Sequence, residues 1–449
     1  MRWTNLDSFI QEKLKRTGLP GISLALINQG EVIYAKGYGF RDLEARLPAT
    51  PNTVYGIASV SKPFTAVAIL QLVEEGKLSL EDPIEKFLPI NARPFGDSIR
   101  IWHLLTHTSG IPALDFIEAE IRNVQKTREK LWNLAEIILW LNKSSGWAEA
   151  RPGERWFYLN EGYTLLGAII EKVSGVPYAE YVRERIFKPL QMDSTGFLGD
   201  DFSEFATPYF VSDNAGPTKA IAPTMAIGSE AGLASTVLDL AKFINCLLNK
   251  GAPLISEATF TEMIKPRVYL PQEPIIHKIE PPQYAYGFVV QPFSGRTLIG
   301  HPGNIIIYTS FIGFIPEEKI GVAVLANAQG YPAAHIAQVA LASLLNLNIT
   351  QLPFIRLELL KDKIIGVYHS VKSSISVHVR ARADVFEMIF RDKNVYQTIT
   401  MMLESLDENV AIFRTIKDDT VIPATFKLAG ETTELVYDCY KFRRAQSSV

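Results

Sequence analysis

The sequence predicts an α+β fold in which one antiparallel sheet is built from both ends of the first 350 residues and is flanked by helices, followed by a small all-β domain. Runs with strand character lie at residues 21–39 and 284–328, and the segments between them carry apolar residues at helical spacing. Beyond residue 361, short runs alternate apolar and polar side chains. We therefore expect one domain at residues 1–350 and a second at residues 351–449.

The first elements are a helix and a hairpin. Leu6, Phe9, Ile10 and Leu14 recur at the spacing of an amphipathic helix. Two β-rich runs, GISLALINQ and VIYAKGYG, follow this helix and are separated by Gly30-Glu31. This arrangement predicts an antiparallel hairpin.

Helices and then strands complete the first domain. Apolar residues at helical spacing predict helices in the stretches 64–76, 129–143, 164–175 and 235–248. Strand character returns in YAYGFVVQ, GRTLIG, YTSFIGFI and GVAVLANA. A helix that ends in LASLLNLN closes the domain.

The second domain follows a two-residue period. Ile375, Val377 and Val379 alternate with polar residues, and similar runs occur in ADVFEMIF, ENVAIFRTI and ELVYDCYKF. Short strands at this spacing predict a small antiparallel barrel or sandwich. The methionines expected to fill its core rather than bind a cofactor are Met388, Met401 and Met402.

Composition excludes several classes of protein. The chain has 449 residues, of which 47% are hydrophobic and 21% charged, so disorder is excluded as its main state. Its 45 Lys+Arg against 48 Asp+Glu lack the basic excess of a nucleic-acid-binding protein. No apolar run reaches the roughly 18–20 residues of a membrane helix, and the first residues do not resemble a secretory signal. With 2 Cys and 7 His, none at ligand spacing, we expect a reduced, cytoplasmic protein without metal or cofactor.

Ser59 and Lys62 form the first part of a predicted active site. The segment SVSKP directly precedes a helical pattern, and residues three apart share one face of a helix, with Cβ atoms about 5–6 Å apart. Ser59 and Lys62 are therefore expected to meet, whereas Ser61 points elsewhere. A lone Ser-x-x-Lys is also typical of a capping serine beside a solvated lysine, so the interpretation needs support from other motifs.

Two further motifs supply that support. YLN at residues 158–160 follows a Pro-Gly turn and precedes a helix, and GHPGN at residues 300–304 lies between two strands. A serine–lysine acyl transferase needs a nucleophile, a basic partner that takes its proton and a strand edge that lines the cleft. The three motifs fit these three roles.

With LLTHTSGIP at residues 104–112, the chain resembles the serine β-lactamase and penicillin-binding-protein superfamily, in particular the CubicO group of class C-like esterases and peptidases. The resemblance covers residues 5–345 and includes SVSKPFT, LLTHTSG, FYLNEGYTLLG, GSEAGLASTVLDLAKF and GHPG. GVYHS at residues 366–370 opens a region that resembles the lipocalin-like C-terminal domain of archaeal members. The resemblance implies a β-lactamase/transpeptidase-like sheet with flanking helices and a helical subdomain, followed by a lipocalin-like barrel.

The resemblance also implies catalytic roles. Ser59 is the nucleophile, Lys62 is its activating partner, and Tyr158 is the general acid and base. A lysine that is half neutral at pH 7 needs a pKa shift of about 3.4 units, and an ionised tyrosine needs about 3 units. Because the two costs are similar, Lys62 and Tyr158 are treated as one coupled pair, and either can hold the proton.

The remaining motif residues are expected to bind the substrate. Asn160 orients Lys62 and the substrate amide, and His301 and Gly303 line the substrate site. His301 stands where lysine is commoner, so it is expected to be only partly charged at pH 7 and to hold a substrate carboxylate weakly. The backbone N–H groups of Ser59 and Asn304 are expected to form the oxyanion hole.

Other positions are interpreted as departures or as structural residues. Leu159 replaces a serine that is usual in the family, and the isoleucines at 305–307 predict a bulkier, more apolar rim. His107 is expected to be a structural histidine. Glu230 has two interpretations, a residue that lines the cleft or a solvated loop carboxylate, and the second is expected because loop carboxylates are usually solvated.

The sequence therefore predicts a metal-free serine peptidase that hydrolyses short peptides, with peptides containing D-residues as the expected substrates by resemblance. A carboxylesterase with the same site is the alternative. A non-catalytic protein on this fold is expected to lack Lys62 or Tyr158, and both are present. No nucleic-acid or membrane partner is expected. We expect a homo-oligomer whose C-terminal domains lie at or near the contacts or the active-site entrance.

Overall fold

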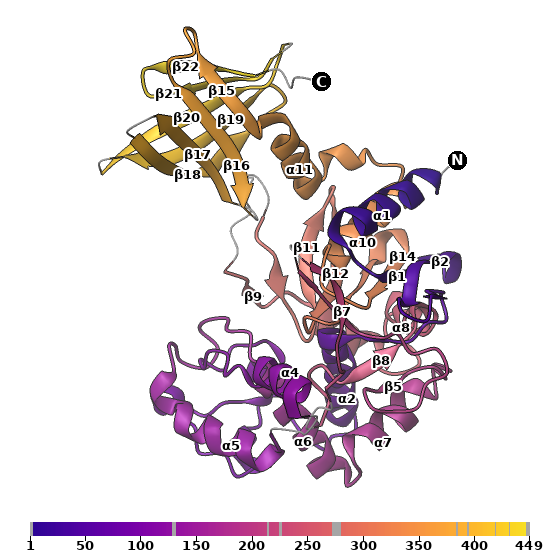
Figure 1. Ribbon diagram of the computed structural model, residues 1–449. Helices are drawn as coiled ribbons and strands as arrows, with labels where there is room; N and C mark the ends of the chain where they lie inside the picture. Colours follow the sequence, from indigo (N-terminus) through magenta and orange to yellow (C-terminus); the bar gives the residue numbers. More distant parts are fainter. Residues whose placement is uncertain are drawn as a thin grey trace. The chain divides into compact units, whose positions relative to one another are not determined.

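The computed structural model describes residues 3–127, 132–212, 215–223, 227–271, 280–382, 385–392, 395–417, 419–430 and 432–445. Apart from the segment 272–281, the chain divides into two compact units (Figure 1). The first contains Met1–Pro271 and Pro282–Leu347, and the second contains Asn348–Val449. Each unit has its own hydrophobic core.

The first unit is built on a nine-stranded sheet with the order β3-β2-β1-β14-β13-β12-β11-β10-β9. The hairpin from the start of the chain pairs with the last strand of the unit, and Ala25 lies opposite Ala323 in this antiparallel pair. This pairing confirms the predicted sheet built from both ends of the domain. The strands are β1 (Gly21–Asn28), β2 (Glu31–Asp42), β3 (Leu47–Pro48), β9 (Val268–Tyr269), β10 (Gln283–Tyr284), β11 (Val289–Phe293), β12 (Arg296–Asn304), β13 (Thr309–Ile315) and β14 (Ile320–Ala326).

Helices cover the centre of this sheet. All seven residues of β14 are buried, so both faces of that strand are covered. Helices α8 (Val237–Leu248) and α10 (Ala333–Leu344) both pack against it, and α1 (Thr4–Thr17) packs against α10 and β2. The predicted first helix, hairpin and last helix of this domain are thus present in the structure.

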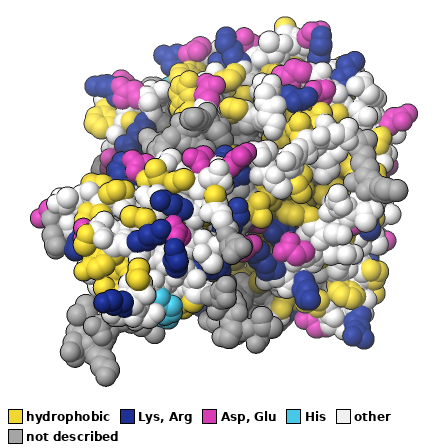
Figure 2. Space-filling model, turned by 90° about the horizontal axis from the view of Figure 1, so that it is seen from above, with side chains coloured by type: hydrophobic (Ala, Val, Ile, Leu, Met, Phe, Trp, Pro, Cys, Tyr) yellow, Lys and Arg dark blue, Asp and Glu magenta, His cyan; other side chains and the backbone are white. Residues whose placement is uncertain are grey.

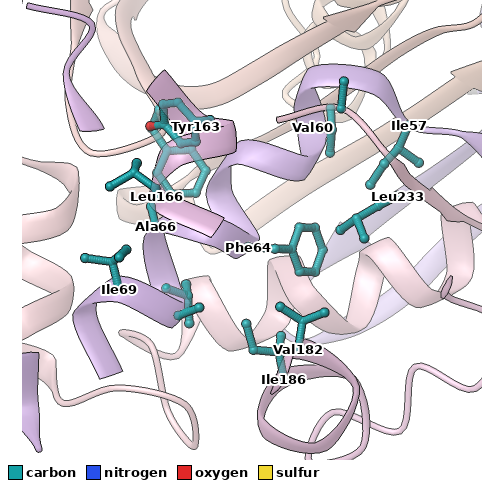
Figure 3. Packing of buried hydrophobic residues seen from close by; sticks show 14 of the residues in the cluster. Ile57, Val60, Phe64, Ala66, Ile69, Tyr163, Leu166, Val182, Ile186 and Leu233 are labelled. Atoms are coloured by element: carbon teal, nitrogen blue, oxygen red, sulfur yellow. The ribbon is translucent and has the colours of Figure 1, made fainter. Parts of the chain in front are cut away.

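A second group of helices surrounds α2 (Ser61–Glu74). Residues Ser61–Leu72 of α2 are buried all round, which is typical of a central core helix. Phe64 stacks on Phe243 with ring centroids 4.0 Å apart, and Val182 and Ile186 lie close by (Figure 3). The other helices of this group are α3 (Ile101–Leu105), α4 (Phe116–Thr127), α5 (Leu134–Lys143), α6 (Asn160–Ser174), α7 (Tyr178–Val182) and α9 (Glu257–Ile264).

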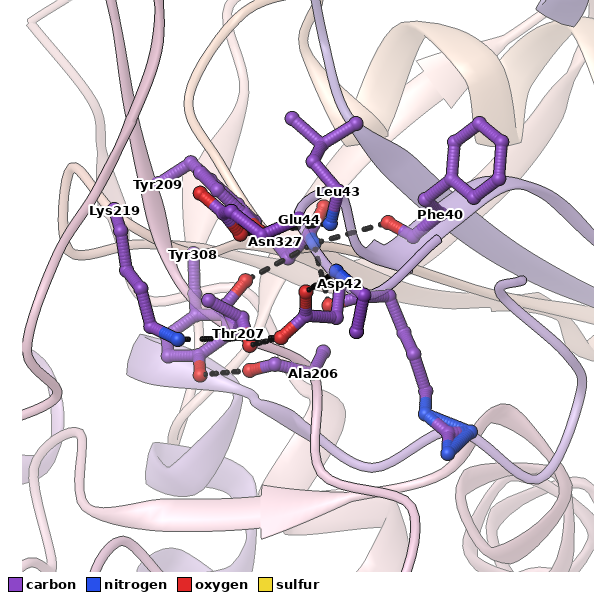
Figure 4. A network of polar contacts seen from close by, with 12 residues as sticks. Phe40, Asp42, Leu43, Glu44, Ala206, Thr207, Tyr209, Lys219, Tyr308 and Asn327 are labelled. Carbon is purple, nitrogen blue, oxygen red and sulfur yellow. Dashed lines mark hydrogen bonds and ion pairs between the residues drawn. The ribbon is translucent and has the colours of Figure 1, made fainter. Parts of the chain in front are cut away.

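Short strands and a polar network connect the sheet to the helical part. The strands are β4 (Tyr55–Gly56), β5 (Gly196–Phe197), β6 (Tyr209–Ser212), β7 (Ala215–Lys219) and β8 (Leu233–Ser235). Asn327, just after β14, donates from Nδ2 to the carbonyl groups of Phe40, Arg41 and Thr207 at 3.0–3.3 Å (Figure 4). Tyr209 donates to Glu44 at 2.5 Å. These bonds join β2, β6 and the end of β14.

The second unit is a closed barrel of eight antiparallel strands, which confirms the predicted small barrel. Helix α11 (Pro353–Ile364) precedes it, and Leu360 and Ile364 of this helix belong to the barrel core. The strands are β15 (Gly366–Ser370), β16 (Ser376–Arg382), β17 (Val385–Asp392), β18 (Val395–Leu406), β19 (Val410–Lys417), β20 (Thr420–Lys427), β21 (Glu434–Tyr437) and β22 (Tyr440–Arg444).

The barrel interior is a packed apolar core. Phe386, Phe413 and Phe426 are buried, with the ring of Phe413 5.0 Å from that of Phe386 and 5.4 Å from that of Phe426. Met401 is buried as predicted, but the prediction for Met402 is wrong, because Met402 is 65% exposed. Neighbouring residues of a strand face opposite sides of the sheet, so only one of the two can point inward.

The surface and the helices add two observations. On the face shown in Figure 2, basic and acidic side chains are interspersed. Among the described residues, no helix combines the length and the apolar character required to cross a bilayer.

Candidate active site

Ser59 lies in a tight turn that leads into α2. The turn is a 3-10 segment, Ala58–Val60, and α2 begins only at Ser61. The sequence placed Ser59 and Lys62 on one α-helix, whereas the structure places Ser59 in the turn just before it. The two side chains still meet, with Lys62 Nζ 3.1 Å from Ser59 Oγ.

The backbone just before Ser59 is strained. Ala58 has a φ of +50°, a left-handed conformation that costs a non-glycine residue about 1–2 kcal/mol. Ser61 stabilises the turn, because its hydroxyl donates to the Ala58 carbonyl at 2.7 Å and accepts from the Leu233 N–H at 3.1 Å. Ser61 therefore points away from Lys62, as predicted.

Lys62 is completely buried, and its amine lies among oxygen atoms. Its Nζ lies 3.1 Å from Ser59 Oγ, 2.8 Å from Asn160 Oδ1 and 2.9 Å from the Glu230 backbone carbonyl. An ammonium can donate to all three oxygens. A neutral amine can donate to Asn160 and Glu230 and accept the Ser59 hydroxyl proton. Both forms satisfy these contacts, and both have Lys62 in contact with the nucleophile.

Tyr158 lies beside Lys62 and is positioned by His107. The Lys62 Nζ is 4.7 Å from the centre of the Tyr158 ring. His107 accepts the Leu159 N–H on Nδ1 at 3.1 Å and the Phe157 N–H on its backbone carbonyl at 2.8 Å. Its ring lies 4.2 Å from the Tyr158 ring. His107 thus forms hydrogen bonds with the backbone on both sides of Tyr158 and contacts the Tyr158 ring.

His107 is a buried, neutral histidine. Burial lowers its pKa well below the usual value, and the nearby Lys62 charge lowers it further. Since Nδ1 accepts a hydrogen bond, the proton is assigned to Nε2. This geometry agrees with the structural role expected for His107. The backbone segment that His107 supports is the one that carries Tyr158.

Asn160 is the first residue of α6, directly after Leu159. This position directs its side chain to Lys62. Leu159 is 1% exposed and belongs to the hydrophobic core.

Gly303 allows β12 to approach the turn that carries Ser59. A Cβ at this position would lie 2.1 Å from Ser310 Oγ and 2.4 Å from the carbonyl oxygen of Ile57. Any side chain would therefore push β12 away from the nucleophile. Ser310 holds the same place by donating to the Ile57 carbonyl at 2.6 Å.

The pairing of β12 shows where the Asn304 N–H points. Ile305 donates to the Tyr308 carbonyl, so in the regular β12–β13 pair the N–H groups of residues 301, 303 and 305 face β13. The N–H of Asn304 therefore faces the other side, where β11 starts pairing only at Val289 opposite Gly300. It points to an unpaired strand edge.

His301 differs from the expectation of a partly charged residue. It is 2% exposed, its Nδ1 lies 2.6 Å from the Pro302 carbonyl, and its Nε2 lies 2.9 Å from the Tyr284 hydroxyl. Burial and the Lys62 charge lower its pKa to about 3, so it is neutral at pH 7. The prediction of partial charge assumed a solvated ring and is corrected here.

The rim is also less apolar than expected. Ile305 and Ile307 are 3% and 0% exposed and belong to the core, and only Ile306 is partly exposed. Within the described residues, no group of three or more His, Cys, Asp or Glu side chains is arranged to hold a metal ion.

Glu230 is the residue that sequence reasoning missed. It was interpreted as solvated, but it is 3% exposed, and its carbonyl accepts a hydrogen bond from Lys62. The one signal in the sequence is the pair of glycines around it: Gly228 has a φ of +87°, and a Cβ on Gly232 would lie 2.4 Å from the Gly228 Cα. The tight turn next to Glu230 therefore requires glycine at both positions.

Comparison with known proteins identifies the family. The beta-lactamase family model matches residues 6–345. The chain belongs to the beta-lactamase family. The motifs predicted this family from the sequence. The model of the Pab87 octamerisation domain matches residues 349–443.

Three individual proteins illustrate the relationship. The structure of an octameric penicillin-binding protein homologue from Pyrococcus abyssi is 40% identical, with a TM-score of 0.92 over 99% of this chain and 100% of that one. A D-stereospecific amidohydrolase from Streptomyces sp. is 25% identical, with a TM-score of 0.65 over 77% of this chain and 99% of that one. Protein flp from Staphylococcus aureus (strain MW2) is 29% identical over 330 residues. The matched region covers 72% of this chain and 62% of that relative. The chain thus spans less than two thirds of the length of that relative.

Proposed function

We propose that this protein is a serine peptidase that hydrolyses short peptides through an acyl-enzyme on Ser59. The observation that carries the proposal is the contact between Ser59 Oγ and the fully buried Lys62 Nζ, beside the ring of Tyr158. A serine hydroxyl is a weak nucleophile until a neighbouring group takes its proton. Lys62 and Tyr158 together supply that group.

In the proposed reaction, Ser59 Oγ attacks the peptide carbonyl carbon while its proton passes to the Lys62–Tyr158 pair. The carbonyl oxygen becomes an oxyanion that accepts hydrogen bonds from the N–H groups of Ser59 and Asn304. Tyr158 protonates the leaving amine, the C–N bond breaks, and an ester remains on Ser59. Water then attacks the carbonyl carbon of this ester, and its proton passes through the same pair to Ser59 Oγ. The ester C–O bond breaks, the acid leaves, and the Ser59 hydroxyl is restored.

The proposed binding residues are Asn160, His301 and Gly303. Asn160 accepts from Lys62 through Oδ1 and has its amide N–H₂ to offer to a substrate carbonyl. Gly303 lies where any side chain would separate β12 from the nucleophile turn. Similarity to a D-stereospecific amidohydrolase supports peptides with D-residues as substrates.

A carboxylesterase with the same site is the second candidate. The observation that favours it is the neutral, buried state of His301, because this residue then supplies no positive charge for the carboxylate of a peptide end. An uncharged ester does not need such a charge. The same acyl chemistry serves both substrates.

We also propose that the chain forms a homo-oligomer of two-domain subunits, with a domain boundary near residue 350 and the C-terminal domains at or near the contacts or the active-site entrance. The match of residues 349–443 to an octamerisation domain, and the similarity to an octameric homologue, support this assembly. The free cysteines Cys246 and Cys439 are in keeping with a reducing, cytoplasmic location.

The test is peptide hydrolysis by wild type and by Ser59→Ala, measured by mass spectrometry on matched L- and D-residue peptides and on short-chain p-nitrophenyl esters. We expect wild type to cleave peptides and Ser59→Ala to cleave none. Ser144→Ala is the matched control, because it removes a buried serine hydroxyl outside the site, one that donates to the Leu141 carbonyl. Cleavage of the esters alone would replace the peptidase by the esterase, and equal cleavage by wild type and Ser59→Ala would refute the proposed nucleophile.

A further inference from the structure

His301 lies on the face of β12 that is turned toward the nucleophile. Side chains two residues apart on a strand share one face of the sheet. A Cβ on Gly303 would lie 2.4 Å from the carbonyl oxygen of Ile57, directly before the turn that carries Ser59, so His301 faces the same way. The centre of its ring is 6.4 Å from that of Tyr158. A substrate bound at Ser59 therefore comes close to the His301 ring.

Both ring nitrogens of His301 have hydrogen-bond partners within the protein. Nδ1 lies 2.6 Å from the Pro302 carbonyl oxygen, which can only accept, so Nδ1 carries the proton and donates it. Burial lowers the pKa of this ring to about 3, so the ring is neutral and Nε2 is an acceptor. The hydroxyl of Tyr284, 2.9 Å away, donates to Nε2. With both nitrogens bonded, the ring can present only carbon atoms to a substrate.

Tyr284 is fixed in this position by its surroundings. It is 1% exposed and belongs to β10, and its carbonyl accepts the Arg267 N–H at 3.0 Å. The centre of its ring is 4.9 Å from that of His107 and 5.8 Å from that of His301. A hydrogen bond to the neutral form of a base disfavours the charged form. The Tyr284 hydroxyl thus acts in the same direction as burial and keeps His301 uncharged.

Basic side chains beside this group are directed to other partners. Arg267 stacks on the ring of Tyr286 at 3.9 Å and pairs with Glu262 at 3.0 Å. The Lys62 amine lies among oxygen atoms of the protein. Binding a substrate carboxylate against His301 would remove water from that carboxylate, and the ring supplies neither a cation nor an N–H in return. Desolvation of a charge without a partner is unfavourable.

We propose that Tyr284 determines which peptide bonds this site accepts. Its hydroxyl keeps His301 without a charge or a free N–H, so the site favours a bond that is followed by an uncharged group, such as a further peptide bond or a carboxamide. A bond next to a free C-terminal carboxylate is disfavoured. This inference rests on the proposed function, a peptidase with Ser59 as its nucleophile. Tyr284 is a positioning residue, since it acts through His301 and not on the substrate.

The experiment uses two short peptides of one sequence, one that ends in a free carboxylate and one that ends in a carboxamide. Hydrolysis of the last peptide bond is followed by mass spectrometry, and kcat and KM are determined for each peptide. We expect the wild-type kcat/KM to be at least about tenfold higher for the carboxamide, because hydrogen bonds to a charged group have effects of that size. Ser59→Ala is expected to cleave neither peptide.

Tyr284→Phe removes the hydroxyl and keeps the ring. Nε2 of His301 then loses its donor and takes a proton more readily, so the KM of the carboxylate peptide should fall by about threefold or more relative to that of the carboxamide. A merely structural role of the hydroxyl would change both peptides alike. His301→Lys is the second variant, because it supplies a cation outright, and it should lower the preference for the carboxamide by about tenfold.

Two neutral substitutions are the controls. Tyr368→Phe removes another buried tyrosine hydroxyl, one that donates to the Ile364 carbonyl at 2.8 Å in the second unit, and it should keep the wild-type preference. His301→Gln replaces the ring by an uncharged side chain, so its preference for the carboxamide should not fall as that of His301→Lys does.

The possible failures are distinguishable. If wild type cleaves the carboxylate peptide as well as the carboxamide through Ser59, or if neither Tyr284→Phe nor His301→Lys lowers the preference, Tyr284 does not set the specificity, while the peptidase itself stands. If wild type cleaves neither peptide at any bond, the proposed function is wrong, and the inference that rests on it is overturned as well.

Discussion

The barrel and the active site of the first unit are built on opposite principles. In the barrel, each strand from β15 to β22 pairs with its neighbour in sequence, and a two-residue alternation determines which side chains face inward. In the active site, Lys62 bonds to Asn160, 98 residues away, and to Glu230, 168 residues away. The barrel depends on apolar packing between local elements, and the site depends on buried polar groups brought together from distant ones.

This difference predicts that chemistry and stability can be separated by mutation. The largest effect is expected for Lys62→Met, which replaces the buried amine by an apolar chain of similar length. Without it, Ser59 loses its activating partner, and kcat/KM should fall by at least about 10³-fold while circular dichroism still shows a folded chain. Lys265→Met, at a lysine that is 60% exposed, is the control that should keep full activity. Wild-type activity in Lys62→Met would contradict the claim that Lys62 activates Ser59.

Phe413→Ala in the barrel is expected to lower stability and to leave the reactivity of Ser59 unchanged. Phe413 is fully buried against Phe386 and Phe426, and its removal should lower the free energy of unfolding by about 3–5 kcal/mol in urea titrations. The rate at which a fluorophosphonate probe labels Ser59 of the folded protein should stay within about twofold of the wild-type rate. A labelling rate that falls together with stability would mean that the two regions are not independent.

Gly303→Ala tests the place where backbone packing and chemistry meet. Its Cβ would overlap the Ile57 carbonyl and Ser310 Oγ, so β12 must shift away from Ser59. We expect kcat/KM to fall by about 10²-fold, because a displacement of about 1 Å in an active site has effects of that size. Gly146→Ala, whose Cβ meets no atom within 4 Å, is the control. Equal activity in the two variants would show that catalysis does not depend on the close approach of β12 to Ser59.

The last prediction is a pH dependence of stability. The folded-state pKa is about 3 for His301 and about 4 for His103, against an ordinary value of 6.5. Since the unfolded chain binds these protons more readily, the stabilisation is complete above about pH 6.5 and is lost as the pH falls toward these values. Urea unfolding at about pH 7 and about pH 4.5 should show this loss, and the loss should be smaller in His301→Gln. An equal loss in both proteins would show that His301 is not buried neutral.

The contrast between the barrel and the active site also explains which features could be predicted from the sequence. The barrel, the hairpin of β1 and β2, and the helices α1, α2, α5, α6, α8 and α10 follow from periodicity, because each depends on residues close in sequence. The helix predicted at 129–143 is present as α5 from Leu134, and residues 129–131 lie outside the described part of the chain. The motifs around Ser59, Tyr158 and His301 marked the candidate site. The 3-10 turn at Ser59 and the left-handed Ala58 could not be predicted, since tertiary packing imposes that conformation.

The charge states of the site could not be predicted either. His301 was expected to be partly charged and Glu230 to be solvated, and both side chains are buried. A side chain of a loop or strand end is solvated or buried according to what packs over it, and one sequence pattern allows both. The pKa of His301 follows from that packing, not from its residue type.

The measurement that tests the central claim most directly is intact-protein mass spectrometry after rapid acid quenching during turnover of a short peptide. The account predicts an adduct with the mass of the acyl fragment on wild type, located by proteolysis to the peptide that contains Ser59, and no adduct on Ser59→Ala. An adduct on another residue, or peptide turnover by Ser59→Ala at the wild-type rate, would contradict an acyl-enzyme on Ser59.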